Sequence, residues 1–543
     1  MLRMIQLLLS FVLPAVLFGQ ANTQSQRKPL VFSHITVIDA TGASAKPDMT
    51  VVITGDRITQ LGPTGKVKVP KYAQVIDAKG KFLIPGLWDM HVHLDRVGEG
   101  ALPLFIANGL TSVRDMGGGD FAQIRLWRES IARESLLGPR IKASGPILES
   151  TRFIQILEKI GGESLAGKRV GVGREAEVLK AVDSIRNLGV DFLKVRTNAS
   201  REAYLAIAAE AKRSGLQLVG HAPSGVSLLE VSDAGQKSIE HGLVFLDNYT
   251  EAEWKELAAR FIKNGTHSVP TLIAGRGFRE MPDQEVMAII DDGTNGRDSR
   301  RKYIPPALLE FWRQQMEMKK YETPTDWTLV RERNLQGFRI LNQAGVRMMA
   351  GTDVAAPLVF PGFSLHEELG LLVKDIGMTR MEALQSATRN PAEFFGLGAS
   401  LGTVEKGKIA DLVLLDANPL EDISNTQKIN AVVVRGKLIP KSELKRILAT
   451  VEVAANRKLS RSVLRSRPDR DLSSVPRARI DFFNLPRIPL APPSALRFAC
   501  RSSLSVSLSR LPGLRPCSRL QSALRPQPNN TGSRGAECLW IQL

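Results

Sequence analysis

The stretch PGLWDMHVHL, at residues 85–94, sets two histidines on either side of one valine. Residues two apart on a β-strand point to the same face, so His91 and His93 aim together while Val92 points the other way into the packing. Two neutral imidazoles that converge from one strand make half of a metal site, and imidazole suits zinc and its neighbours. The pair is a weak signal by itself, so its partners must be sought elsewhere in the chain.

Seven more short apolar runs follow this segment, and helix-like stretches separate them. In one of these stretches, REAYLAIAAEAKRSG, Gly215 is well placed to end a helix. Eight strand-like runs in this order predict an α/β protein with a (β/α)8 TIM barrel over 85–399. Residues 274–332 are too long for a simple loop, and we expect a partly helical insertion over the mouth that sets substrate selectivity. The seven runs are TSVRDMGG, RIKASGP, DFLKVRT, LQLVGHAP, SIEHG, HSVPTLI and VRMMAGTD.

Short β-rich runs separated by turns occupy residues 30–84 and return at 400–440, on the two sides of the barrel segment. These runs predict one small β-sandwich domain that is built from both ends of the body.

Three barrel runs end in residues that can bind a metal. His221 ends LQLVGHAP, His241 ends SIEHG and Asp353 ends VRMMAGTD. The C-terminal ends of barrel strands are where such folds build their active sites, so these side chains are expected to join the histidine pair. Lys194 lies inside the apolar run DFLKV, where burial lowers the pKa of an amine. It is either a salt-bridged lysine or a neutral amine that has captured carbon dioxide as a carbamate.

The chain resembles the amidohydrolase superfamily, and within it the imidazolonepropionase-like and Xaa-Pro dipeptidase (prolidase) branch. The stretches that carry the resemblance span roughly residues 30–439: PGLWDMHVHL, GLTSVRDMGG, DFLKV, VGHA, IEHG, AGTD, ALQSATRNPAEFFGL and LGTVEKGKIADLVLLDANPL. Imidazolonepropionase uses one metal and lacks the bridging lysine, so Lys194 favours the two-metal, peptidase-like relatives.

The resemblance implies a centre with two divalent metal ions. Zinc is the first expectation, and the same ligands also accept cobalt, manganese or iron. His91 and His93 would hold one ion, His221 and His241 the other, carbamylated Lys194 would bridge them, and Asp353 would complete the first site. A metal lowers the pKa of bound water from about 15.7 toward about 7, which gives hydroxide at neutral pH. Asp353 would then act as general base and general acid.

These features predict a hydrolase that cleaves carbon–nitrogen bonds of a small molecule, a dipeptide or an N-acyl amino acid. A cyclic amide or lactone is the alternative substrate, and a barrel scaffold without activity is a third reading. Three residues are candidates for substrate contact, each beside a structural role: Arg196 for a carboxylate or an internal ion pair, His267 at the start of the seventh run, and His366 after the eighth.

Most of the formal net charge of +18 lies in one segment of the 543-residue chain. Residues 455–543 hold 15 Arg and one Lys against three Asp and one Glu, a net of +12, which leaves +6 for the body. All three cysteines also lie there, so the body has no thiolate metal site. This Arg-rich tail could bind anionic surfaces, but its composition favours disorder. We therefore expect no nucleic-acid partner, and a homo-oligomer remains open.

The N-terminal segment MLRMIQLLLSFVLPAVLFGQA has the features of a secretory signal peptide. Arg3 precedes an apolar run, and Gly19 and Ala21 provide the small residues that allow cleavage after residue 21. The run is short for a membrane span, although an uncleaved anchor is the alternative. The sequence thus predicts a secreted or periplasmic protein with no stable membrane span after removal of the signal.

Overall fold

The computed structural model describes residues 27–166, 168–196, 200–242, 249–319 and 325–456. The predicted signal peptide at 1–21 and the Arg-rich tail beyond residue 456 lie outside the described residues. Within those ranges, no helix is both long and apolar enough to cross a lipid bilayer.

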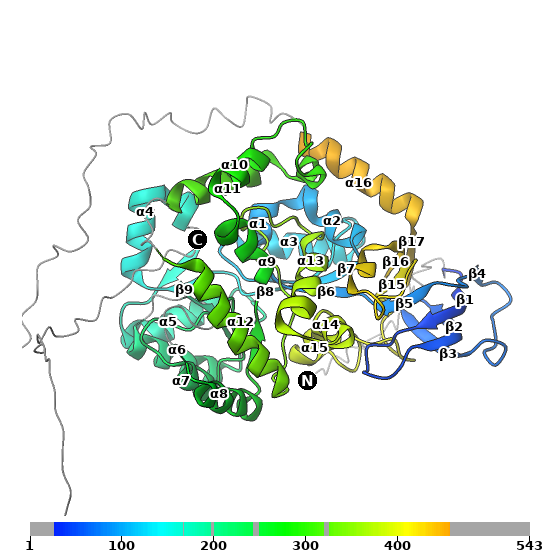
Figure 1. The fold of residues 1–543 in the computed structure, drawn as a ribbon, viewed down its shortest axis with the longest axis horizontal. Helices are drawn as coiled ribbons and strands as arrows, with labels where there is room; N and C mark the ends of the chain where they lie inside the picture. Colours follow the sequence, from blue (N-terminus) through cyan, green and yellow to red (C-terminus); the bar gives the residue numbers. More distant parts are fainter. Residues whose placement is uncertain (1–26, 167, 197–199, 243–248, 320–324, 457–543) are drawn as a thin grey trace, which may run out of the picture. The chain divides into compact units, whose positions relative to one another are not determined.

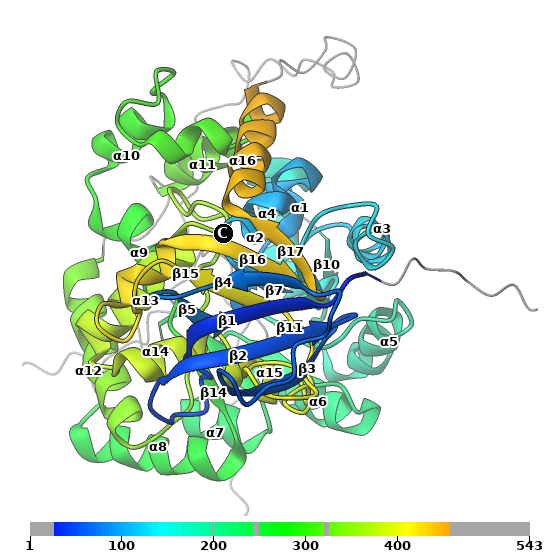
Figure 2. The same cartoon turned by 90° about the vertical axis from the view of Figure 1, so that its right-hand side faces the viewer.

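The two β-rich segments meet in one mixed eight-stranded sheet, with the order β17-β16-β15-β5-β1-β2-β3 and β4 paired with β1 (Figure 2). The N-terminal and C-terminal halves join where β15 pairs antiparallel with β5, with Leu412 opposite Pro85. Buried Leu83, Leu412 and Val433 belong to the apolar core of this sheet. The strands are β1 (Leu30–Val37), β2 (Lys46–Thr54), β3 (Arg57–Pro63), β4 (Gln74–Asp77), β5 (Phe82–Pro85), β15 (Leu412–Leu415), β16 (Ile429–Val434) and β17 (Lys437–Pro440).

Seven of the predicted runs form short parallel strands, which are β6, β7, β8, β11, β12, β13 and β14. They belong to two sheets, β6-β7-β8 and β10-β9-β11-β12-β13-β14, and the second sheet also contains β9 and β10, which the sequence did not predict. Both faces of such strands are buried, one under helices and the other inside the barrel-like core, which explains why their residues form continuous apolar runs rather than alternating ones. The strands are β6 (Leu87–Val92), β7 (Leu110–Asp115), β8 (Arg140–Ala143), β9 (Ile147–Glu149), β10 (Arg169–Gly171), β11 (Leu193–Val195), β12 (Leu218–Gly220), β13 (Ser238–Glu240) and β14 (His267–Val269).

The eighth run, VRMMAGTD, lies between β14 and β6 and makes isolated β-bridges to both. Met348 bridges to Ser268 of β14, and Val354 bridges to Val92 of β6. The Met349 amide donates to the Ser268 carbonyl at 2.9 Å, and the Met90 amide donates to the Ala350 carbonyl at the same distance. The fold is therefore α/β and TIM-barrel-like, with the predicted runs in the predicted order.

Helices connect the parallel strands, and those labelled α5 to α8 lie outside them in Figure 1. Helix α6 begins after Ser200, whose side chain accepts the Ala203 amide, and it ends at Gly215 in the left-handed conformation, as predicted. The helices outside the insertion are α1 (Leu94–Val97), α2 (Leu102–Ala107), α3 (Phe121–Ala132), α4 (Thr151–Ala166), α5 (Glu175–Arg186), α6 (Arg201–Ser214), α7 (Leu228–Asp233), α8 (Glu251–Asn264), α12 (Trp327–Gln343), α13 (Ser364–Leu371), α14 (Arg380–Ser386), α15 (Arg389–Phe394) and α16 (Lys441–Asn456).

The long segment after β14 contains the predicted helical insertion. Its elements are α9 (Leu272–Gly275), the π-helical turn η2 (Arg276–Glu280), α10 (Asp283–Ile290), the 3-10 turn η3 (Ser299–Tyr303) and α11 (Pro306–Met318). The predicted end at residue 332 is too late, because α12 already begins at Trp327, where the Asp326 side chain caps it by accepting the Leu329 amide. A separate apolar cluster, which includes Trp312 and Phe360, joins the insertion to the turn after the eighth run.

Candidate metal centre

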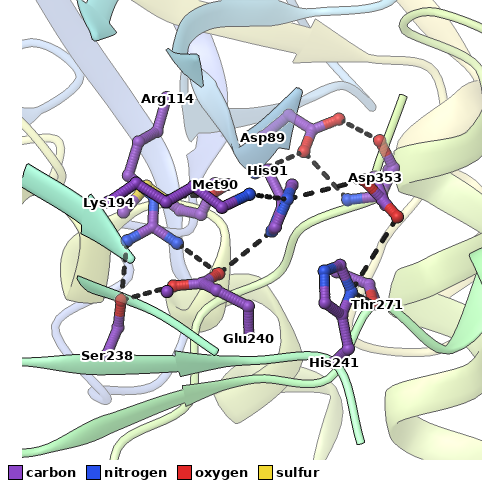
Figure 3. Close-up of polar contacts among 12 residues, drawn as sticks. Asp89, Met90, His91, Arg114, Lys194, Ser238, Glu240, His241, Thr271 and Asp353 are labelled. Carbon is purple, nitrogen blue, oxygen red and sulfur yellow. Dashed lines mark hydrogen bonds and ion pairs between the residues drawn. The ribbon is translucent and has the colours of Figure 1, made fainter. Parts of the chain in front are cut away.

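Six of the predicted site residues come from the C-terminal ends of the barrel runs. His91 lies in β6, and His93 is the first residue after the end of that strand. Lys194 lies in β11, and the other three directly follow their strands or close the eighth run: His221 after β12, His241 after β13, and Asp353. Figure 3 shows His91, His241, Lys194 and Asp353 turned toward one another.

The Asp353 carboxylate lies at the middle of this histidine cluster. Its Oδ1 is 3.4 Å from His91 Nε2 and 3.5 Å from His93 Nε2, and its Oδ2 is 3.9 Å from His241 Nδ1. Ligand atoms of His91, His93 and Asp353 all lie within 4.8 Å of one another, close enough to share one ion. The ring centres of His91 and His241 are 4.5 Å apart, and those of His221 and His241 are 4.9 Å apart. His221 therefore adjoins the same group of side chains.

Hydrogen bonds at Nδ1 orient the rings of His91 and His93 so that their Nε2 atoms face Asp353. His93 Nδ1 lies 2.7 Å from the Gly117 carbonyl, and His91 Nδ1 lies 3.1 Å from Glu240 Oε2. A carbonyl or a carboxylate only accepts, so each Nδ1 carries a hydrogen, and in the neutral form of the ring Nε2 is the nitrogen that can bind a metal. Metal-binding histidines have this arrangement, with the second nitrogen donating to a carboxylate or carbonyl.

Burial keeps His91, His221 and His241 neutral. It lowers the pKa of His91 and of His221 well below the usual value, and nearby cations and the other rings lower both further. Burial also lowers the pKa of His241 to about 4. The pKa of Asp353 falls well below its usual range: burial alone would raise it, but His241, His91 and His93 outweigh burial. Neutral imidazoles around an ionised carboxylate form a donor set that fits a divalent metal ion.

Lys194 is almost fully buried, with 2% of its surface exposed, and its Nζ lies 3.4 Å from His91 Nε2. Burial, followed by the neighbouring cation Arg196, lowers the pKa of this amine to about 7. A substantial fraction of the amine is therefore neutral near pH 7. That is the form able to react with carbon dioxide, so its chemistry fits the expected carbamate.

A buried ion pair supports His91 on its Nδ1 side, away from Asp353, and no sequence pattern pointed to it. Glu240 is the last residue of β13, directly before His241. Its Oε2 accepts from Arg114 Nη2 at 2.6 Å as well as from His91. Ser238 donates to the other oxygen at 2.5 Å, and Arg114 also donates to Ser238 Oγ and to the Met90 carbonyl. Glu240 and Arg114 side chains are fully buried, and Figure 3 shows the closed network.

Asp89 is a second supporting carboxylate, two residues before His91. Its Oδ1 accepts the amides of His91 and Thr352, and its Oδ2 accepts the Thr352 hydroxyl at 2.6 Å. Burial outweighs these bonds and raises the pKa of Asp89 to about 7. Asp89 thus links β6 to the run that ends in Asp353. Its position two residues before His91, in DMHVH, could have identified it from the sequence.

Arg196 follows β11 and lies near the cluster, with 7% of its surface exposed. Its Nε is 3.8 Å from Glu149 Oε2, so the internal ion pair considered for it is present. Among the described residues, this buried Nε has no hydrogen-bond partner, so the guanidinium keeps capacity to bind a further anion.

The other two candidate substrate contacts lie elsewhere. His267 is at the start of β14, opposite Ser238, with Nδ1 3.2 Å from the Gly265 carbonyl and its ring against Phe394. This is the opposite strand end from the cluster, which favours the structural role considered for His267. The ring nitrogens of His366 lie 2.9 Å from Thr426 Oγ1 and 3.0 Å from the Asn108 carbonyl, so they are engaged within the protein and favour the structural role.

Comparison with known proteins decides the family. Residues 82–439, about two thirds of the chain, match the model of the amidohydrolase family. The chain belongs to this family. It is therefore a hydrolase of carbon–nitrogen bonds, in a family whose members generally use divalent metals.

Relatives of this amidohydrolase act on different substrates, to judge from their names. Ochratoxinase of Aspergillus niger is 24% identical over 402 residues, covering 64% of this chain and 73% of the relative. Imidazolonepropionase of Pseudomonas paraeruginosa is 27% identical over 383 residues, covering 67% and 87%. Among solved structures, a putative prolidase from Bifidobacterium longum is 26% identical with a TM-score of 0.60, covering 78% of this chain and 99% of that one.

Proposed function

We propose that this amidohydrolase holds two divalent metal ions, best matched by zinc, and cleaves the amide bond of a dipeptide or an N-acyl amino acid. His91, His93 and Asp353 would hold the first ion. His221 and His241 would hold the second, with carbamylated Lys194 between the two. One observation carries the proposal: neutral imidazoles and a buried amine of lowered pKa surround a single ionised carboxylate at one end of the strands.

Bound metal ions would activate a water for attack at neutral pH and polarise the scissile carbonyl. The chain's own part begins with Asp353, whose side chain is 20% exposed and so can be reached from solvent. Its low pKa keeps it ionised and ready to take a proton from the attacking water. It can then deliver that proton to the leaving nitrogen, acting first as general base and then as general acid.

Arg196 would bind the carboxylate of the substrate. It lies two residues beyond Lys194, it is buried, and its Nε has no hydrogen-bond partner in the described part of the chain. A charged donor that is desolvated in this way gains from a carboxylate ligand. The resemblance to a solved putative prolidase supports the dipeptide class, whereas the imidazolonepropionases favour the alternative, a cyclic amide or a lactone. The family assignment favours either over an inactive scaffold.

The decisive experiment measures amino-acid release from a library of dipeptides and N-acyl amino acids, with and without a chelator. We expect chelator-sensitive release that returns when zinc is added back. No release by a chain confirmed to carry two metals would refute the dipeptide proposal and favour a cyclic substrate. Arg196→Met should raise KM at least tenfold for substrates with a free carboxylate and leave their amidated analogues unchanged. Arg174→Met, at an exposed arginine, is the control.

Three structural expectations accompany this function. The bridges on both sides of the eighth run support closure of the eight runs into a barrel, spanning 85–399. The shared sheet supports a composite β-domain from 30–84 and 400–440. Its eight strands belong to one hydrogen-bonded sheet, so the expected sandwich would require this sheet to fold onto itself. The N-terminal segment supports export and cleavage after Ala21, which N-terminal sequencing of the exported protein tests. A chain that still begins at Met1 would contradict cleavage.

A further inference from the structure

The turn that follows Asp353 has a strained backbone. Asp353 has φ 59°, Ala355 has φ 135° and Leu358 has φ 61°, although none of the three is glycine. L-residues rarely adopt these conformations, and Ala355 lies in a region that glycine alone occupies with ease. Such a backbone persists only where the surroundings hold it in place, and it concentrates at functional sites. The question is which contacts hold residues 353–358 in this shape.

The first contact comes from helix α11 of the insertion. Gln315 Nε2 donates to the Ala355 carbonyl at 2.8 Å, and only 2% of Gln315 is exposed. Trp312, one helical turn earlier, packs edge-to-face on Phe360, with ring centres 5.6 Å apart. A buried amide among apolar neighbours is costly unless it is hydrogen-bonded, so an apolar residue would serve packing better at position 315. The amide is explained by the carbonyl that it holds.

The second contact comes from the π-helical turn η2. A Cβ at Gly277 would lie 2.3 Å from the Pro357 carbonyl oxygen, a distance that no side chain tolerates. The glycine therefore lets the backbone of η2 lie directly against the strained turn. Two separate elements of the insertion thus touch residues 355–357 from outside the barrel runs.

The other end of the turn is tied to the metal centre. The Asp353 amide donates to the His91 carbonyl at 2.8 Å, and the Ala356 amide donates back to the Asp353 carbonyl at 2.9 Å. The direction of the Asp353 carboxylate is therefore set by a short turn with one end on the histidine strand and the other under the insertion.

We propose that Gln315 is a positioning residue, which holds the strained turn through Ala355 and thereby aims Asp353 at the histidine cluster. The insertion would then do more than line the mouth, because its helix α11 would fix the geometry of a group in the reaction centre. The kinetic part of this inference rests on the proposed role of Asp353, whereas the part about the turn rests on the contacts alone.

The first test measures hydrogen exchange of peptides that span residues 353–360 in the full chain. Gln315→Met keeps the volume and removes the donor, and Gln314→Met is the matched control, because Gln314 is on the same helix, is only partly buried and has its side chain directed to Glu310. We expect exchange at the Ala356 and Val359 amides to rise about tenfold in Gln315→Met, since loss of the donor releases strain of this order. Unchanged exchange would overturn the proposal, whether or not any substrate is found.

The second test compares kinetics and adds a rescue. With a substrate from the library, Gln315→Met should lower kcat about tenfold with little change in KM, while Gln314→Met stays at the wild-type level. Ala355→Gly removes the side chain that makes φ 135° unfavourable, so adding it to Gln315→Met should restore most of kcat. A general loss of packing would not be rescued in this way, and failure of the rescue would reduce Gln315 to a structural role. Absence of turnover in the wild type would contradict the proposed function and leave the exchange result to judge the turn.

Discussion

His241 and His267 are carried by neighbouring parallel strands, yet they lie in opposite environments. His267 opens β14 at the level of Ser238, where its ring lies against Phe394 of α15. His241 follows β13 at the other end, with its ring 4.5 Å from that of His91. At about 3.3 Å per residue, the three steps from Ser238 to His241 separate the two levels by roughly 10 Å. The strand end, more than the residue type, decides whether a histidine joins the histidine cluster around Asp353.

The largest expected effect is at Lys194. Lys194→Ala should reduce turnover to background and lower the bound metal, because it removes the amine expected to bridge the two ions. Lys237→Ala is the control at the opposite level, since Lys237 precedes β13 and its Nζ bonds the Asn264 carbonyl. Metal content by mass spectrometry and turnover are measured on both. Wild-type turnover in Lys194→Ala would refute the carbamate. It would also mean that the two strand ends do not differ in their importance for activity at this position.

A smaller effect is expected at Glu240, which hydrogen-bonds to the candidate ligand His91. Glu240→Gln removes the charge that accepts from His91 and neutralises buried Arg114, so metal affinity should fall about 10-fold to 100-fold. Ser238→Ala leaves the contacts of Glu240 with Arg114 and His91 in place, and it should lower affinity much less. Competition with a chromophoric chelator measures both. Equal affinities in the two variants would show that the network behind the histidine strand does not act on the metal.

His366 offers a comparison in stability rather than activity. Burial lowers its pKa from 6.5 to about 4, so between these values the unfolded chain binds a proton that the folded chain does not. The free energy of unfolding should therefore fall as pH decreases from about 6.5 to about 4, by about 3 kcal/mol from this residue. Denaturant titrations of His366→Gln should give a shallower fall over the same window. An identical slope in both proteins would contradict the lowered pKa.

The sequence predicted the order of the barrel runs and the candidate metal ligands that the structure brings together, because both follow from local patterns. Apolar runs mark buried parallel strands, and the residues that end them converge at one edge. Glu240 and Arg114 were missed although they belong to IEHG and TSVRDMGG, because sequence does not show which buried charges meet across strands. The strained turn was hidden for a related reason, since DVAAPL has no glycine where φ is positive.

The position of a residue along its strand, and its partners on other strands, also decide its role. HSVPTLI forms the seventh run, as expected, and its first residue, His267, lies at the N-terminal strand end, opposite Ser238 of β13. Its place at the start of the run already indicated this end, because barrel sites form at the C-terminal ends of the strands. Arg196 is the converse case, because its facing followed from Lys194 while its partner Glu149 lies on a strand 47 positions earlier in the sequence.

The smallest expected effect returns to His267 and tests the comparison directly. His267→Leu should leave kcat/KM within about twofold, because the residue lies at the level opposite to the metal centre. Its buried Nε2 has no hydrogen-bond partner among the described residues, so an apolar side chain against Phe394 should raise the free energy of unfolding by about 1 kcal/mol. Steady-state kinetics and denaturant titration measure the two quantities. A large loss of kcat/KM with unchanged stability would mean that the lower strand ends also act in catalysis, and the rule drawn from His241 would fail.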